Sequence, residues 1–251
     1  ARTRRIGKYN PETEERKIGF DVGITKVPIV PGAVLFDLNV GKHTVRPDHR
    51  MGYEACLNAS NSNTEMGNIG AGTGATVGKL FGDDFCMKGG LGTASIHMEN
   101  IVVGAIVAVN CLGDVIDLNT GEILAGTLNK SKTGFADTVK QITEGIQGEN
   151  VFGQNTTIGV VATNAILSKA QSKKVASMAH NGFARTIRPA HTVFDGDTIF
   201  CMSTGEIDID VSLLGVLAAE VMSRAVVRAI KNTKTAYGKP AYRCFCNKKF
   251  K

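Results

Sequence analysis

The sequence predicts an α/β protein organised as a layered sandwich of sheets and helices. Three observations lead to this class. Residues 101–110 (IVVGAIVAVN) and 155–165 (NTTIGVVATNA) are runs of β-branched and small apolar residues, which are typical of buried strands. Residues 211–230 carry one apolar stripe at helical spacing and therefore predict a long helix. Strands and helices alternate irregularly along the chain, and no internal repeat is visible.

The N-terminal part of the chain predicts loops and short elements. Residues 1–20 are polar and charged, as in a helix or a linker. Residues 26–38 (KVPIVPGAVLFDL) are apolar and interrupted by two prolines, which predicts a strand or an edge strand with a turn. Residues 52–60 predict a short helix. A glycine-dense loop, 67–78 (GNIGAGTGATVG), then leads towards the first buried strand.

The C-terminal part alternates turns, helices and strands. Asn119-Thr120-Gly121 separates two apolar runs and predicts a hairpin. Helical spacing recurs over 135–146 and 168–185, and the polar loop 148–155 (GENVFGQN) lies between these segments. An Asp-Gly-Asp turn then opens the strand expected over 194–202.

Composition and charge restrict the function classes. The 251 residues suffice for a sizeable core, and we expect a single domain, 1–251. The net charge of +6 comes largely from basic residues near both ends without interleaved aromatic side chains, so no nucleic-acid partner is expected. No apolar run reaches the ~18 residues of a membrane span and no charged-then-apolar leader opens the chain, so we expect neither a membrane partner nor secretion.

The cysteines and histidines do not predict a metal site. The six cysteines show no C-x-x-C pair, and no two of the five histidines are spaced i, i+4. Several cysteines lie in apolar segments, where a free thiol behaves as a small apolar side chain. A reducing compartment is the simplest interpretation. We therefore expect a cytoplasmic protein without a metal ion or cofactor.

The most informative segment is the strand that begins at Thr156 and Thr157. If the peptide bond after Asn155 breaks, the new first residue carries a hydroxyl nucleophile and a free α-amine. The reference pKa of such an amine, roughly 7.7–8, allows it to accept a proton near neutral pH. The alternative is an ordinary threonine-rich strand entry. The polar loop before the junction lies where a processing site requires it.

The glycine-dense loop lacks the residues that a phosphate-binding loop requires. A P-loop ending at Gly78-Lys79 needs glycine at position 73 and Ser or Thr at position 80, where this chain has Thr73 and Leu80. The loose dinucleotide-binding pattern has no clear preceding strand and no suitable acidic residue after it. We expect the glycines to let the backbone approach a site closely. Lys79 is then either a solvated lysine or, in a cleft, a donor to an acyl oxygen.

Three further polar residues are candidates for the same site. Asn110 ends a strongly apolar strand, either as a turn cap or as an oxyanion donor. Asp195 and Asp197 place two carboxylates on one side of an extended segment. They form either an Asx-type turn or a pair that orients the ammonium group of the cut chain or of a substrate.

Together these segments resemble the DmpA-type family of self-processing aminopeptidases and amidases. The resemblance covers about residues 18–242 and rests on six ordered motifs. They are VPIVPGAVLFDL (27–38), GAGTGATVGK (70–79), MKGGLGTAS (87–95), VGAIVAVN (103–110), NTTIGVVATNA (155–165) and IRPAHTVFDGDTIF (187–200).

The resemblance implies a fold, a maturation step and an assembly. The fold would be a four-layer αββα sandwich shared with ornithine acetyltransferase. Members are made as inactive precursors that cleave themselves, which here would give an α chain, 1–155, and a β chain, 156–251. The αβ units would form a homo-oligomer, expected to be a tetramer, and the substrates would be short peptides or ω-amino amides.

The resemblance also implies a role for each candidate residue. Thr156 matches the nucleophile, and Asn155 supplies the carbonyl that is attacked during processing. Asn110 matches the oxyanion donor. Three residues match positions around the nucleophile in the nylon-oligomer (6-aminohexanoate) hydrolase branch, which also has the Asn-Thr-Thr and Asp-Gly-Asp motifs: Lys79, Asp195 and Asp197.

Two features depart from the family. Phe36 stands where several members place an oxyanion tyrosine, and its ring cannot donate a hydrogen bond. Loss of one such donor typically costs about 10²–10³ in rate. The upstream part of the family's α chain also has no counterpart in this sequence.

The sequence therefore predicts an N-terminal-threonine amidohydrolase or aminopeptidase that acts through an acyl-enzyme. One alternative is an acyltransferase like ornithine acetyltransferase, in which an amine takes the acyl group in place of water. The other is a non-catalytic oligomeric relative that never cuts itself.

Overall fold

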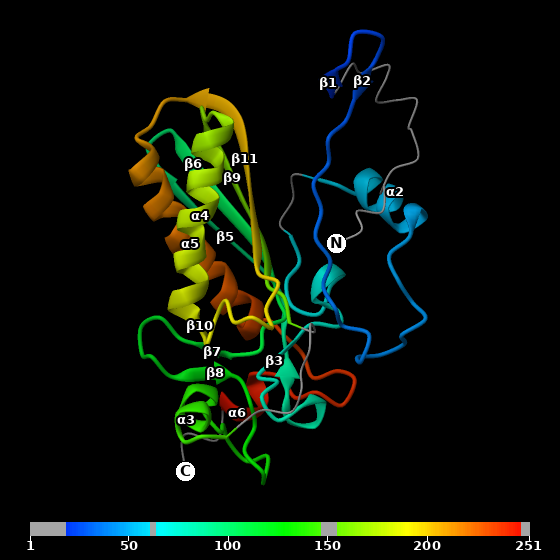
Figure 1. Ribbon diagram of the computed structural model, residues 1–251, viewed down its shortest axis with the longest axis vertical. Helices are drawn as coiled ribbons and strands as arrows, with labels where there is room; N and C mark the ends of the chain where they lie inside the picture. The colour runs from blue at the N-terminus through cyan, green and yellow to red at the C-terminus, as the bar shows by residue number, and fades with distance from the viewer. Residues whose placement is uncertain (1–18, 61–63, 147–154, 247–251) are drawn as a thin grey trace. The chain divides into compact units, whose positions relative to one another are not determined.

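The computed structural model describes residues 19–60, 64–146 and 155–246. The chain divides into two compact units, of which the smaller comprises residues 1–33 and 42–63. Its elements are the hairpin of β1 (Phe20–Asp21) and β2 (Lys26–Val27) and the helix α2 (His49–Leu57) (Figure 1). The edge strand expected over 26–38 is thus only two residues long, because the prolines that follow have no amide hydrogen for a ladder. The short helix is confirmed, three residues earlier than expected.

The larger unit, residues 34–41 and 64–251, is built on a four-stranded sheet. Its order is β11 (Thr198–Ile207), β9 (Ile158–Ala165), β6 (Ile101–Val109) and β5 (Gly90–Met98). Strands β5, β6 and β9 pair antiparallel, and β9 and β11 pair parallel. The strands predicted within 101–110, 155–165 and 194–202 are confirmed.

Strand β5 was not predicted, because its glycines obscure the strand pattern. The packing of the neighbouring helix explains one of them. A Cβ atom on Gly92 would lie 2.1 Å from the carbonyl oxygen of Ala225 in helix α5 (Val211–Lys231). The helix therefore packs directly against the backbone of the strand, which only glycine allows.

Helices α4 (Lys169–Thr186) and α5 lie side by side on one face of the sheet (Figure 1). Both helices were predicted, and each begins at a capping side chain, Ser168 for α4 and Asp210 for α5. Alternate residues of β6 and the apolar stripe of α5 form the core between the layers. Its members include Val103, Val107, Leu214, Val221 and Met222.

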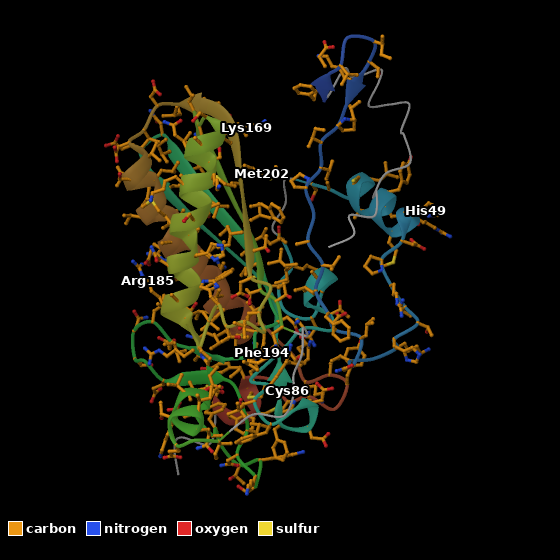
Figure 2. All side chains as sticks on the ribbon, viewed as in Figure 1. His49, Cys86, Lys169, Arg185, Phe194 and Met202 are labelled. Atoms are coloured by element: carbon orange, nitrogen blue, oxygen red, sulfur yellow. The ribbon has the colours of Figure 1, made fainter. Side chains whose placement is uncertain are left out.

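The opposite face of the sheet is largely half-exposed. Met202 on β11 lies on this face and is 62% exposed (Figure 2). The α/β class is confirmed, and the described residues provide one helix layer and one main sheet of the predicted αββα arrangement. Among the described helices, none combines the length and apolar character that a bilayer crossing requires.

Smaller elements lie at one end of this sheet (Figure 1). A three-stranded antiparallel sheet has the order β10 (Ile187–Arg188), β7 (Asp114–Ile116) and β8 (Ile123–Ala125), and β7–β8 is the predicted hairpin. The helix expected over 135–146 is shorter than predicted, α3 (Thr138–Thr143), because Asp137 caps it.

The remaining short elements are β3 (Thr76–Val77), β4 (Met87–Lys88), α6 (Arg243–Cys246) and two 3-10 turns, η1 (Gly70–Gly72) and η2 (Asp83–Phe85). The helix or linker expected over 1–20 and the loop expected over 148–155 lie outside the described residues, apart from residues 19, 20 and 155. The single domain and its cleavage into 1–155 and 156–251 stay predictions.

Candidate active site

The sheet topology brings three chain segments together at one end of the strands. Strand β6 runs antiparallel to β9, so the residues that follow β6 lie beside those that precede β9. Strand β11 runs parallel to β9, so the residues before β11 lie at the same end of the sheet. Asn110, Thr156 and Asp195 therefore meet, although they are far apart in the chain. The Thr156 amide donates to the Asn110 carbonyl at 3.0 Å, and Asn155 forms a parallel bridge with Asp195.

Thr156 is positioned against the carbonyl group of the residue before it. Its side-chain hydroxyl Oγ1 donates to the Asn155 carbonyl oxygen at 2.5 Å, and only 9% of the residue is exposed. The same oxygen accepts a hydrogen bond from the Gly196 amide at 2.9 Å. A Cβ atom on Gly196 would lie 3.0 Å from Thr156 Oγ1, so glycine leaves room for the hydroxyl. A hydroxyl nucleophile and an amide donor thus converge on one carbonyl group.

Lys79 and Asn110 form a buried pair beside this junction. The Lys79 ammonium donates to the Asn110 side-chain oxygen at 2.9 Å and to the Asn110 carbonyl oxygen at 3.2 Å. That carbonyl oxygen also accepts the Thr156 amide, so one acceptor joins Lys79 to the nitrogen of the Asn155–Thr156 peptide bond. The Asn110 side-chain amide donates to the Phe36 carbonyl at 3.1 Å. The role of Asn110 as an oxyanion donor stays a prediction, since in the continuous chain its NH₂ group binds a main-chain oxygen.

Lys79 lies in the protein interior. It is 3% exposed, and burial lowers its pKa from 10.5 to about 8, against the opposing effect of acidic groups that include Cys111. The preceding Gly78 explains how a lysine reaches this position, because its φ is +71° and a Cβ atom there would meet the backbone of Gly126 at 1.9 Å. The expected close backbone approach at the glycine-dense loop is confirmed. A lysine with a pKa near neutrality can exchange a proton during a reaction.

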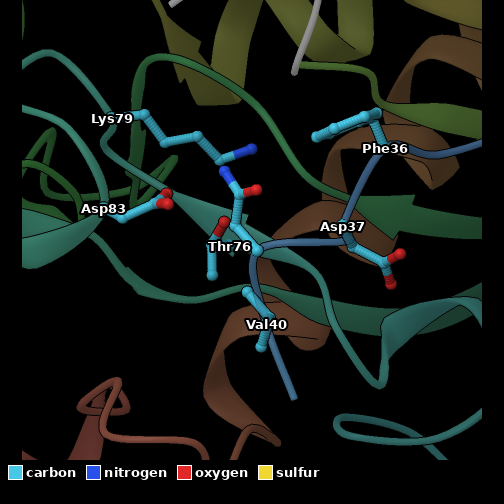
Figure 3. Close-up of a pocket in the computed structure, with 7 residues that line it drawn as sticks. Phe36, Asp37, Val40, Thr76, Lys79 and Asp83 are labelled. Atoms are coloured by element: carbon cyan, nitrogen blue, oxygen red, sulfur yellow. The ribbon is translucent and has the colours of Figure 1, made fainter. Parts of the chain in front are cut away.

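Phe36 belongs to the site through its backbone. It lines a cavity of about 10 Å³ together with Asp37, Asn39, Val40, Thr76, Lys79 and Asp83. The Phe36 ring and the Lys79 ammonium point towards one another across this space (Figure 3). Such a volume holds about one water molecule. The Phe36 carbonyl orients Asn110, whereas its ring offers no donor to an oxyanion.

Asp195 and Asp197 each hold a main-chain amide of a neighbouring segment. Asp197 Oδ1 accepts the Thr157 amide at 2.8 Å, and Asp195 Oδ1 accepts the Leu112 amide at 3.3 Å. Neither of these hydrogen bonds reaches the Thr156 nitrogen. Burial raises the pKa of Asp197, and its hydrogen bond with the Thr157 amide opposes that rise. In the continuous chain the carboxylates therefore brace the strands around the junction.

The geometry favours Thr156 over Thr157 as the nucleophile. The Thr157 hydroxyl is buried and has no hydrogen-bond partner among the described residues. Its amide is held by Asp197, whereas the Thr156 hydroxyl adjoins the Asn155 carbonyl. No group of three or more His, Cys, Asp or Glu side chains within the described ranges could hold a metal ion.

Comparison with known proteins assigns the chain to a family. The model for Peptidase family S58 matches residues 8–242. The chain belongs to peptidase family S58. The predictions of a peptidase family and of hydrolysis of amide bonds are thereby confirmed at the level of the family.

Two relatives of this S58 chain show how far the likeness extends. An uncharacterized aminopeptidase of Mycobacterium bovis is 38% identical over 253 residues, which cover 92% of this chain and 71% of that protein. A 6-aminohexanoate-oligomer endohydrolase of Agromyces sp. (strain KY5R) is 29% identical over 240 residues, which cover 86% of this chain and 64% of that protein.

A solved structure supports the fold. The L-aminopeptidase D-Ala-esterase/amidase of Ochrobactrum anthropi, described as a variant of the Ntn-hydrolase fold, superposes with a TM-score of 0.52 at 20% identity. The match covers 74% of this S58 chain and 50% of that one, so the chain spans about half of the solved protein. This likeness concerns the fold, and the roles of individual residues stay predictions.

Three contributors to the S58 site were not predicted from the sequence. The Gly196 amide donates to the Asn155 carbonyl, His191 Nδ1 lies 2.8 Å from Asp197 Oδ2, and the Thr192 hydroxyl donates to Asp195 Oδ2 at 2.6 Å. Only the Thr192–Asp195 contact has a local signal, the spacing of a side-chain turn. The position of His191 depends on how the loop folds back, which spacing does not reveal.

Proposed function

We propose that this S58 chain is a self-processing amidohydrolase whose mature nucleophile is Thr156. The observation that carries the proposal is the 2.5 Å contact between Thr156 Oγ1 and the Asn155 carbonyl oxygen. In processing, Oγ1 attacks the Asn155 carbonyl carbon, the C–N bond to Thr156 breaks, and the hydroxyl proton passes to the departing nitrogen. Water then hydrolyses the resulting ester, which leaves a carboxylate on Asn155 and a free α-amine on Thr156.

The uncut chain also indicates how a substrate would react. The substrate carbonyl takes the place of the Asn155 carbonyl, where the Gly196 amide stabilises the oxyanion. The free amine of Thr156 accepts the Oγ1 proton as Oγ1 attacks, and that proton leaves with the substrate's amine. Water then hydrolyses the acyl-enzyme. The Lys79 ammonium, which shares the Asn110 carbonyl, disfavours protonation of the Thr156 amine and so keeps it available as a base.

Short peptides and ω-amino amides are the proposed substrates. The names of the relatives support this class, since one is named an uncharacterized aminopeptidase and another a 6-aminohexanoate-oligomer endohydrolase. Asp37 and Asp83 line the cavity beside Lys79 and supply negative charge for a substrate ammonium group. We further propose a cytoplasmic location and a homo-oligomer of αβ units. Free thiols at all six cysteines support a reducing compartment.

Intact-mass spectrometry under denaturing conditions tests the proposal. The purified protein should yield chains of 155 and 96 residues, about 16 and 10 kDa of the 26.6 kDa total in proportion to length, the smaller beginning at Thr156. Thr156→Ala should stay uncut, and the matched control Thr157→Ala should still cleave. An uncut wild-type protein that hydrolyses amides, or a block by Thr157→Ala alone, would overturn the assignment.

A second assay separates hydrolysis from acyl transfer. Release of the acyl group is measured with and without an added amino-acid acceptor. The proposal expects the free acid as the product in both cases. An acylated acceptor as the main product would favour a transferase instead.

A further inference from the structure

Asp197 has an environment that its hydrogen bond to Thr157 does not explain. The carboxylate is 3% exposed, and burial of an ionised carboxylate is costly unless it is paired. Its second oxygen, Oδ2, accepts no main-chain bond from the strands of the site. It lies 2.8 Å from the ring nitrogen Nδ1 of His191.

His191 is held in place from several sides. Its backbone amide also donates to Asp197 Oδ2, at 3.3 Å, so the residue wraps around that oxygen. The backbone φ of His191 is +56°, a left-handed conformation that non-glycine residues rarely adopt. Residues in such conformations are costly and gather at functional sites. The loop therefore adopts an unfavourable backbone conformation where the imidazole meets the carboxylate.

Helix α4 supplies the second partner of the imidazole. His191 Nε2 lies 3.3 Å from His180 Nδ1, and the Phe183 ring lies against both imidazoles, at centroid distances of 6.0 and 5.6 Å. Burial and the charge of His191 lower the pKa of His180. Nδ1 of His191 thus faces Asp197 and Nε2 faces His180, so each ring nitrogen has a polar partner. The other ionisable groups that act on Asp197, the carboxylate partner of His191, are Asp195 and Cys111.

We propose that His191 is a positioning residue for the Thr156 nucleophile, acting through Asp197. The imidazole orients the carboxylate, the carboxylate fixes the Thr157 amide, and the fixed strand entry holds Thr156 Oγ1 against the scissile carbonyl. His191 makes no hydrogen bond to Thr156 in the described structure, so it does not itself transfer the proton. This inference rests on the proposed function and adds a residue to it.

Removal of the imidazole has a consequence for pH dependence. Burial raises the pKa of Asp197, and the charge of His191 opposes that rise. Without His191 the carboxylate becomes protonated at a higher pH, and a protonated carboxyl holds the Thr157 amide less well. The acidic limb of the rate profile therefore moves to higher pH in His191→Ala. A residue that only supports the fold would lower the rate without moving this limb.

The test compares His191→Ala and His191→Asn with His97→Ala as the matched control, because His97 is exposed on β5. Self-cleavage is followed after cell-free synthesis at a series of pH values, and kcat and KM of the mature enzymes are measured on an aminohexanoate oligomer. His191→Ala should slow both processes about 10–100-fold, by analogy with the outer partners that orient metal ligands, whose loss typically has effects of this size. KM should stay constant, and the acidic limb of the pH–rate profile should move to higher pH.

His191→Asn keeps a nitrogen donor near the position of Nδ1 and should recover most of the lost rate. Equal rates and equal pH profiles for His191→Ala and the wild type would overturn the inference alone, because the wild type would still cleave. A slow His191→Ala with an unmoved acidic limb and no recovery by asparagine would show a structural role and would also overturn it. A wild-type chain that never cleaves would instead overturn the proposed function.

Discussion

The buried lysine at position 79 leads to a prediction about stability as well as activity. Replacement by methionine keeps the volume of the side chain but removes the charge. A pKa of about 8 in place of 10.5 means that the fold disfavours the ammonium form by roughly 3 kcal/mol, because one pH unit is worth about 1.4 kcal/mol. The two hydrogen bonds that are lost offset part of this gain, at ~1 kcal/mol each.

Lys79→Met should therefore raise the free energy of unfolding at pH 7 by about 1–2 kcal/mol. Neither acceptor on Asn110 is left unpaired, since its side-chain oxygen keeps the Thr76 amide and its carbonyl keeps the Thr156 amide. The same variant should lose self-cleavage, because the charge beside the scissile nitrogen is gone. Stability and activity are expected to change in opposite directions.

The pH dependence of stability gives the sign of this effect. The folded chain holds its Lys79 proton less tightly than the unfolded chain, so the unfolded chain binds more protons between pH 8 and 10.5. The free energy of unfolding therefore rises with pH across that window. This gain is lost again as pH falls through about 8. Lys88, whose pKa is also lowered to about 8 by burial, contributes in the same direction.

Urea unfolding at pH 7 to 10.5 measures these effects, with every variant carrying Thr156→Ala so that uncut chains are compared. The Lys79→Met chain should be more stable at pH 7, and its free energy of unfolding should rise less steeply with pH. Lys88→Met is the matched control and should change stability little, because the three hydrogen bonds lost to the carbonyls of Gly72, Thr73 and Ala75, at ~1 kcal/mol each, offset a burial penalty of similar size. A destabilised Lys79→Met chain, or equal pH slopes with and without Lys79, would refute the reasoning.

Two further substitutions test the geometry of the junction. Gly196→Ala places a methyl group 3.0 Å from Thr156 Oγ1 and should slow self-cleavage at least ~10-fold. A mass-spectrometric time course measures the rate, and cleavage as fast as in the wild type would contradict this role of Gly196. Asn110→Ala leaves the buried Thr76 amide without its acceptor and should lower the free energy of unfolding by ~1–3 kcal/mol in urea titrations, while an unchanged midpoint would show that water replaces the side chain.

Local patterns predicted the elements that depend on local physics. The strand at 101–110 was visible because it is buried on one face throughout, and the helix at 211–230 because eleven of its residues are buried along one stripe. Strand β5 was not predicted from the sequence, because glycines stand where a strand pattern needs apolar side chains. These glycines allow helix α5 to pack close to the strand backbone. The edge strand at 26–38 was overestimated, because apolar composition there is not accompanied by a partner for most of its length.

The candidate site shows the same division. Thr156, Asn110, Lys79 and the Asp195–Asp197 turn could be named from the sequence, through a nucleophile motif and a resemblance to a family. Their contacts could not be named. Lys79 binds both oxygens of Asn110, and in the continuous chain the aspartates hold the amides of Leu112 and Thr157.

The sequence by itself determined the chemistry that cleavage before Thr156 would make available, because the new first residue would carry both a hydroxyl and a free amine. It also determined the α/β class through periodicity. Only the tertiary structure decided which groups surround that junction. The pairing of β6, β9 and β11 brings Asn110 and Asp195 to Thr156 at one end of the sheet, and burial lowers the pKa of Lys79. Both effects depend on distances between segments that are remote in the chain, which no local pattern encodes.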